Sequence, residues 1–254
     1  FMGTCTMMYS RLGLAAAVMF VSWNAAAGAG QPAKGEALVA TSPDEAGPDF
    51  ALQGEYEGQM GDQAWGGQVV ALGDGKFDLV LYEGGLPGAG WEKGDARKRA
   101  SGATQAGQTA FATGGWKITL EEDALSVVRA DDADAKLGKL RKAERKSPTL
   151  GAKPPEGALV LFDGTSAEHF RGGKLTEDKQ LAVGCETRES FGDHTLHIEF
   201  RTPFMPYARG QGRANSGVYH SGGSEVQVLD SFGLEGKNNE CGGFYSKREP
   251  DVNM

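Results

Sequence analysis

Two segments in the second half of the chain place hydrogen-bonding side chains on one face of an extended strand. In residues 195–201 and 225–230, polar residues alternate with Leu, Ile, Phe and Val. Because successive side chains of a strand point to opposite faces, each segment has one apolar and one polar face. The polar faces carry His197, Glu199, Arg201, Glu225 and Gln227. Such side chains bind hydroxyl groups in pairs, as on a polyol-binding surface, but an ordinary solvated sheet face explains the same spacing equally well.

The elements that must position these residues follow an all-β pattern. Short apolar or alternating runs are separated by glycine-rich and polar turns, and no segment with helical periodicity lies between them. The runs are residues 159–162, 195–201, 217–220, 225–230 and 242–246. Short strands without intervening helices predict an antiparallel β-sandwich or jelly roll, which we place at residues 157–254.

The first half of the chain shows a second, smaller β pattern. Apolar runs at residues 68–72 and 77–82 flank Asp74-Gly75, a dipeptide typical of tight β-hairpins. Further runs of the same kind follow, and together they predict a small all-β accessory domain over residues 49–129, a meander of about five strands.

Residues 130–156 have the composition of a linker between the two domains. A cluster of Lys and Arg at residues 136–146 is interleaved with Ala and Leu, which predicts a solvated linker or a short helix. Pro154 and Pro155 favour an extended, fairly stiff connection.

Residues 1–29 have the three-part order of a secretory signal peptide. Arg11 precedes an apolar run at residues 12–21, and small residues follow at 25–30. The apolar run is shorter than the ~20 residues that a membrane-spanning helix needs, so we expect cleavage, with a retained anchor as the alternative. A flexible spacer follows at residues 30–48. The leader predicts an exported protein of bacterial type, periplasmic or extracellular, with no membrane span after cleavage.

Charge and cysteine content narrow the possible partners. The net charge is −8 and no basic patch is evident, which argues against nucleic-acid binding. Of the three cysteines, Cys5 lies in the leader, and Cys185 and Cys241 show no zinc-ligand spacing. In an exported protein these two could pair as a disulfide, and two separate buried thiols are the alternative.

Five motifs occur in a fixed order in the second half. They are LFDGT at residues 161–165, FGDHTLHIEFR at 191–201, NSGVY at 215–219, EVQVLDS at 225–231 and CGGFY at 241–245. In this order they resemble the motifs of the 3-keto-disaccharide hydrolase family, over residues 158–254. The sequence departs from the family pattern at Ser224, where an aromatic residue is expected before Glu225. The preceding β domain resembles, more weakly, an accessory region of some family members.

The resemblance implies a concanavalin-like jelly roll with a concave sugar-binding face, here incomplete because the family domain would continue for several strands beyond Met254. It also implies a carbohydrate partner, a glycoside oxidised to a ketone at C3. A base would remove the C2 proton, an enolate would form, and the glycosidic oxygen at C1 would leave by elimination. A hydrogen-bond donor or metal ion would stabilise the enolate oxygen. The alternative function is a non-catalytic carbohydrate-binding module on the same fold.

The resemblance also assigns roles to particular residues. Glu225 is implied as the base, and Asp230 as its acid partner or a metal ligand, although an Asp at the end of a strand equally caps a turn. Substrate binding is implied for Asn215, Gln227, His197 and Glu199. Positive charge near the enolate is implied for Lys247, Arg209 or Arg213. The sequence establishes no cofactor. Whether the site uses a divalent metal ion is left open by the sequence.

Overall fold

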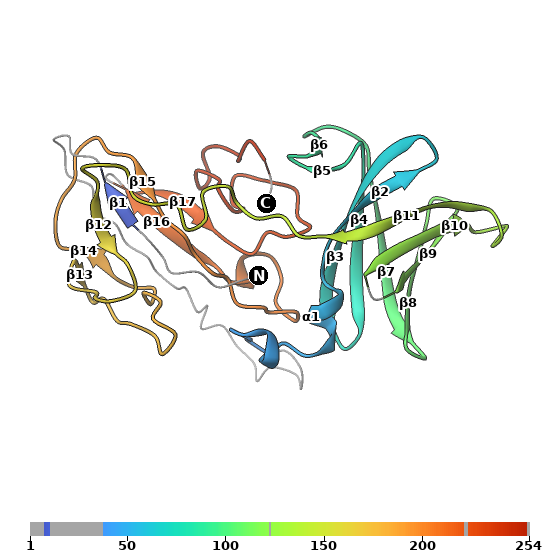
Figure 1. The fold of residues 1–254 in the computed structure, drawn as a ribbon, viewed down its shortest axis with the longest axis horizontal. Coiled ribbons are helices and arrows are strands. Elements are labelled where there is room, and N and C mark those ends of the chain that lie inside the picture. Colours follow the sequence, from blue (N-terminus) through green and yellow to red (C-terminus); the bar gives the residue numbers. More distant parts are fainter. Residues whose placement is uncertain (1–7, 11–37, 122, 221–222, 253–254) are drawn as a thin grey trace.

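The chain forms two regions, a strand-rich one and one of short strands and long loops, joined by an extended segment (Figure 1). The computed structural model describes residues 8–10, 38–121, 123–220 and 223–252. Most of the predicted leader, and the spacer before residue 38, lie outside these residues. Ahead of the first region, a 3-10 helix spans Pro43–Glu45 and helix α1 spans Pro48–Leu52.

Eight strands of the first region close into a barrel. In the order around the barrel they are β10 (Ala124–Arg129), β11 (Lys136–Ala143), β2 (Gly54–Met60), β3 (Gln63–Gly73), β4 (Lys76–Glu83), β7 (Arg97–Gln105), β8 (Gln108–Thr113) and β9 (Trp116–Glu121). All neighbours in the barrel pair antiparallel, and β11 closes it onto β2. Between β4 and β7, the short strands β5 (Leu86–Pro87) and β6 (Gly90–Trp91) form a small parallel pair.

The barrel is built from tight turns and alternating burial. The predicted hairpin at Asp74-Gly75 joins β3 to β4, and these two residues have φ of 54° and 68°, as a two-residue type I′ turn requires. In β4, the side chains of Phe77, Leu79 and Leu81 are fully buried in the barrel core. Each such side chain contributes roughly 1.5–3 kcal/mol by its removal from water.

The structure corrects two expectations about the first region. The predicted meander of about five strands is a closed barrel of eight. The predicted linker is wrong over residues 136–143, which form strand β11. There Leu140 is fully buried in the barrel core while its neighbours Lys139 and Arg141 are exposed. Because β11 pairs with β10 on one side and β2 on the other, it leaves the barrel without a free strand edge.

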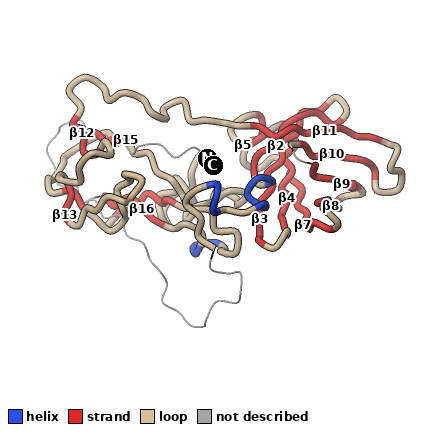
Figure 2. Tube along the Cα trace, turned by 60° about the horizontal axis from the view of Figure 1, so that its bottom comes forward, coloured by secondary structure: helices blue, strands red, loops and turns tan. Residues whose placement is uncertain are grey.

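The second region consists mostly of loops that connect short strands (Figure 2). Strands β12 (Leu159–Phe162), β1 (Met8–Ser10) and β15 (Leu196–His197) form a three-stranded antiparallel sheet. Two further antiparallel pairs join β13 (Phe170–Arg171) to β14 (Glu186–Thr187) and β16 (Ser216–His220) to β17 (Ser224–Val228). Their shared core contains Leu161, Phe162, Phe170, Cys185, Phe191, Val218 and Val228.

The prediction of an all-β fold with antiparallel sheets is confirmed. The runs at 159–162, 217–220 and 225–230 correspond to β12, β16 and β17, but the run at 195–201 contains only the two-residue strand β15. The run at 242–246 forms turns. Strand β1 lies inside the predicted leader, so cleavage at residue 27 or 29 would remove a strand that pairs with both β12 and β15.

The two cysteines of the second region are separate buried thiols. Cys185 and Cys241 are free, which favours the second of the two alternatives drawn from the sequence. Burial raises the pKa of Cys185 to about 11 and also raises the pKa of Cys241. Both thiols are therefore protonated at neutral pH.

In the described part of the chain, no helix has the length and apolar character needed to cross a membrane.

Candidate active site

Strand β17 carries Glu225 and Gln227 in a backbone that is held on both edges. On one edge it pairs with β16, where Tyr219 lies opposite Glu225. On the other edge, the N–H of Gln227 donates to the carbonyl of Gly243, and the N–H of Tyr245 donates to the carbonyl of Glu225, both at 2.9 Å. The turns at 242–246 thus take the place of a third strand. A backbone paired on both sides can hold a reacting group in a defined position.

The Glu225 carboxylate is the carboxylate on this strand that is open to a ligand. Glu225 is half-buried, and its carboxylate makes no hydrogen bond or ion pair with any residue in the described ranges. Its side chain extends over the backbone of Gly217 on the neighbouring strand. A carboxylate with free lone pairs and partial access to solvent is able to accept a proton from a bound substrate.

Gln227 takes part in an amide network centred on Gln211. The Gln211 Oε1 accepts from Gln227 Nε2 at 2.9 Å and from Asn215 Nδ2 at 3.2 Å. Gln211 Nε2 donates to the carbonyl of Asn239 at 2.7 Å. Gln227 is 1% exposed, and its Oε1 is buried without a partner in the described part of the chain. The structure therefore joins Asn215 and Gln227 through Gln211, a residue that strand alternation did not indicate, and their roles in substrate binding stay predictions.

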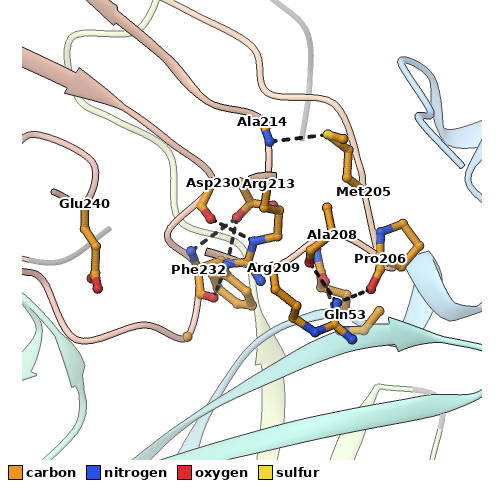
Figure 3. Close-up of polar contacts among 12 residues, drawn as sticks. Gln53, Met205, Pro206, Ala208, Arg209, Arg213, Ala214, Asp230, Phe232 and Glu240 are labelled. Carbon is orange, nitrogen blue, oxygen red and sulfur yellow. Dashed lines mark hydrogen bonds and ion pairs between the residues drawn. The ribbon is translucent and has the colours of Figure 1, made fainter. Parts of the chain in front are cut away.

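Asp230 and Arg213 form a buried ion pair that holds the turn after β17 (Figure 3). Arg213 Nη2 lies 3.3 Å from Asp230 Oδ1, and the guanidinium also donates to the backbone carbonyls of Asp230 at 2.8 Å and Phe232 at 2.6 Å. The N–H of Phe232 donates to Asp230 Oδ1 at 3.2 Å. Burial raises the pKa of Asp230, and the Arg213 charge opposes that rise. Burial likewise lowers the pKa of Arg213, which Asp230 counteracts.

The surroundings of Asp230 differ from those of Glu225. Asp230 lines a pocket of about 120 Å³ between the segment before the barrel and residues 201–204. The other lining residues are Ala40, Thr41, Ser42, Pro43, Phe50, Gln53, Arg201, Thr202, Pro203 and Phe204. Glu225 does not line this pocket, so the structure does not bring the two predicted catalytic carboxylates together. The contacts of Asp230 indicate a role in holding the turn, which is the alternative that the sequence left open.

His197 and Glu199 lie next to each other but belong to the sheet of β12, β1 and β15. His197 Nε2 is 3.1 Å from Glu199 Oε1, and the same oxygen accepts from the N–H of Gly151 at 2.6 Å. Glu199 is 7% exposed, and its Oε2 is buried without a partner in the described residues. Arg201, the third polar residue of this segment, pairs with Asp178. This polar face is therefore largely covered, and Glu199 fixes the segment that connects the two regions.

The remaining predicted cations lie in different settings. Lys247 is exposed beside the β16–β17 hairpin, where its Nζ donates to Ser224 Oγ at 3.1 Å and lies 4.9 Å from the centre of the Phe244 ring. Arg209 donates to the carbonyls of Pro206 and Ala208, at 2.6 and 2.8 Å (Figure 3).

Among the described residues, no group of three or more His, Cys, Asp or Glu side chains comes together as metal ligands.

These features define an all-β chain in which a closed barrel precedes a domain with a partly exposed carboxylate on a firmly held hairpin. Residues 157–254 match the family model described as a 3-keto-alpha-glucoside-1,2-lyase-like domain. The match confirms the resemblance of this region to the 3-keto-disaccharide hydrolase family. Comparisons with curated proteins and with solved structures gave no match.

Proposed function

We propose that this protein cleaves 3-keto-glycosides by elimination, with Glu225 as the base that removes the C2 proton. The observation that supports the proposal most directly is the state of the Glu225 carboxylate. It is half-buried, makes no hydrogen bond or ion pair with a described residue, and stands on a strand whose backbone is paired on both edges. A general base needs free lone pairs and a fixed position, and Glu225 combines the two.

The chemistry follows from the ketone at C3. The ketone acidifies the proton on C2, which passes to the Glu225 carboxylate as the enolate forms. The electron pair of the enolate then expels the glycosidic oxygen from C1, and this oxygen leaves as the alcohol after it takes up a proton. Addition of water across the new C1–C2 double bond, with hydroxide to C1 and a proton to C2, gives the free 3-keto sugar. The sum of these steps is hydrolysis without an oxocarbenium ion flanked by two carboxylates.

The neighbouring polar groups fit supporting roles in this proposal. Asn215, held by Gln211, would orient the sugar on the hairpin, and the buried Gln227 would hold Gln211 in place. Lys247 is placed beside the same hairpin and would supply positive charge to the developing enolate. The roles predicted for Asp230 as an acid and for His197 and Glu199 as sugar ligands stay predictions, since their contacts within the described chain are structural.

Replacement of Glu225 by Gln tests the proposal. We expect Glu225→Gln to lower kcat on a 3-keto-α-glucoside with a chromogenic aglycone by roughly 10²–10⁴-fold, because the amide cannot accept the proton, while binding of the sugar persists. Glu186→Gln is the matched control, since Glu186 already pairs with Arg171 at 2.7 Å on the surface of the same domain. The assay is run with and without a chelator, and a loss of rate with chelator would add a metal ion to the mechanism.

Two results would contradict the proposal in different ways. If Glu225→Gln turned over at the rate of the unmodified protein, Glu225 would not be the base. If the unmodified protein bound the sugar but released no aglycone, the domain would be a carbohydrate-binding module.

We also propose that the protein is exported, on the basis of the basic residue, apolar run and small residues at the start of the chain. Mass spectrometry of the N-terminus of protein expressed from its complete gene would give a mature chain that begins after residue 27 or 29. Recovery of an uncut N-terminus would contradict this proposal and would leave β1 paired with β12 and β15.

A further inference from the structure

Gly217 lies directly beneath the Glu225 side chain. It is buried on β16, opposite Gln227 and two residues before Tyr219, the direct partner of Glu225. A Cβ atom built on Gly217 would lie 2.0 Å from Glu225 Oε1, 2.8 Å from its Cδ and 2.9 Å from its Cγ. The outer part of the glutamate is therefore in contact with the bare Cα of the glycine.

The backbone of Gly217 does not itself require glycine. Its φ is not among the positive values that L-residues avoid. The barrel glycines Gly58 and Gly138 are different, because an added Cβ would meet backbone carbonyl oxygens there, at 2.3 and 2.1 Å. Backbone in a paired strand cannot move aside, whereas the end of a glutamate side chain rotates to another rotamer at modest cost. A methyl group at position 217 would consequently displace the carboxylate and leave the strand pairing in place.

We infer that Gly217 is a positioning residue for Glu225: the absence of a side chain at position 217 creates the space that holds the carboxylate in its working orientation. This inference rests on the proposed function, in which Glu225 is the base. A general base must come within about 2.6–3.2 Å of the atom that carries the proton it removes. A misplacement of about 1 Å can lower the rate by about 10²-fold.

The test uses the full chain with Gly217→Ala and a matched glycine control. We expect Gly217→Ala to lower kcat on the 3-keto-α-glucoside by roughly 10- to 100-fold, with KM and the thermal midpoint nearly unchanged. Gly212→Ala is the control, because Gly212 is exposed at the end of the 3-10 helix Gly210–Gly212 and an added Cβ there has no atom within 4 Å. Wild-type kcat in Gly217→Ala would overturn the inference while leaving the role of Glu225 intact.

A double-mutant cycle separates positioning from a general effect on the fold. Glu225→Ala removes the Cγ, Cδ and Oε1 atoms that a methyl group at position 217 would meet. If Gly217 acts through Glu225, adding Gly217→Ala to Glu225→Ala changes the residual kcat by less than about twofold. An equal loss in both backgrounds would show that Gly217 acts on the fold and would overturn the inference.

A spectroscopic measurement keeps the inference testable if the protein shows no turnover. The ¹³C signal of the Glu225 carboxyl group is assigned by its absence in Glu225→Gln. Gly217→Ala should move this signal and its pH titration, whereas Gly212→Ala should not. A lack of turnover by the wild type together with a moved signal would reject the proposed function alone, and an unmoved signal would reject the positioning role of Gly217.

Discussion

At the scale of single residues, the stacked pair His194 and His220 predicts a loss of stability in mild acid. The rings lie 5.6 Å apart at 22°, and His194 Nδ1–H donates to the carbonyl of Gly192 at 2.6 Å. Burial lowers the pKa of His220, and His194 lowers it further. Because the folded pKa lies below the unfolded value of about 6.5, the unfolded chain binds more protons in mild acid. The contribution of His220 to the free energy of unfolding is therefore fully present above about pH 6.5. It is lost as the pH falls toward the pKa of His220 in the folded protein.

Urea unfolding between pH 7.5 and pH 5 measures this effect. The midpoint of the wild type should fall as the pH is lowered, and His220→Asn should fall less steeply. His169→Asn is the control, since His169 is only half-buried and lies 4.0 Å from Glu189, away from the stacked pair. An identical pH dependence in His220→Asn and the wild type would show that His220 does not cause the loss.

Strand alternation predicted which side chains share a face of a strand, but not which residues from elsewhere in the chain contact them. Glu225 and Gln227 share a face of β17, as the alternation indicates. The contact of Gln227 with Gln211 and that of Glu199 with Gly151 join residues 16 and 48 positions apart. Such contacts depend on how loops return to a strand, which local periodicity does not encode. For the same reason, alternation predicted Glu199 on a polar face, whereas the returning connector buries it.

At the scale of elements, the turns and strong apolar runs were predictable, and the weakly apolar strand was not. The Asp74-Gly75 hairpin was predicted because its residues tolerate positive φ. Strand β11 was missed because Leu140 is its one fully buried residue, with Leu137 only partly buried against the core, and its basic residues are typical of a solvated linker. Residues 136–143 form a strand because they pair with the edges of β10 and β2. This pairing is a tertiary contact, which local sequence does not encode.

The turns at residues 242–246 show the opposite error. The sequence predicted a strand there, and the chain does hydrogen-bond along β17, but turns at Gly242 and at residues 245–247 interrupt it. Phe244 forms isolated bridges both with Val226 and with Arg248, so the segment folds back on itself. The apolar residues that led to the prediction of a strand therefore lie in a compact turn. The same turn brings Lys247 next to Ser224.

At the scale of the whole molecule, the barrel and the second region meet through close contacts. Tyr207 OH donates to Asp74 Oδ1 at 2.8 Å, and its ring packs on Gly73, where an added Cβ would lie 2.1 Å away. Arg97 Nη2 lies 2.8 Å from Glu235 Oε1. The loop that follows β17 is therefore held by the barrel, which gives the barrel a structural role in the domain that carries Glu225.

This contact predicts that the two regions unfold together and that weakening it separates them. Each polar contact of this kind is worth about 0.2–1 kcal/mol, and a loss of about 1 kcal/mol lowers the midpoint of a domain of this size by roughly 4–8 °C. In Tyr207→Ala/Arg97→Ala, the second region should therefore melt earlier by about that amount, while the barrel, with its own core, keeps its midpoint.

Tryptophan fluorescence distinguishes the two transitions. Trp65, Trp91 and Trp116 belong to the barrel region, the fourth tryptophan, Trp23, lies in the predicted leader, and residues 150–254 contain none. In the wild type, fluorescence and calorimetry should give one coincident midpoint; in the double variant, calorimetry should show an earlier transition that fluorescence does not follow. Arg129→Ala is the control, because the Arg129–Asp131 pair lies on the barrel away from this contact. In the double variant, the fluorescence and calorimetric midpoints could instead fall together. That result would contradict the prediction, because it would show that the barrel and the second region unfold as a single unit.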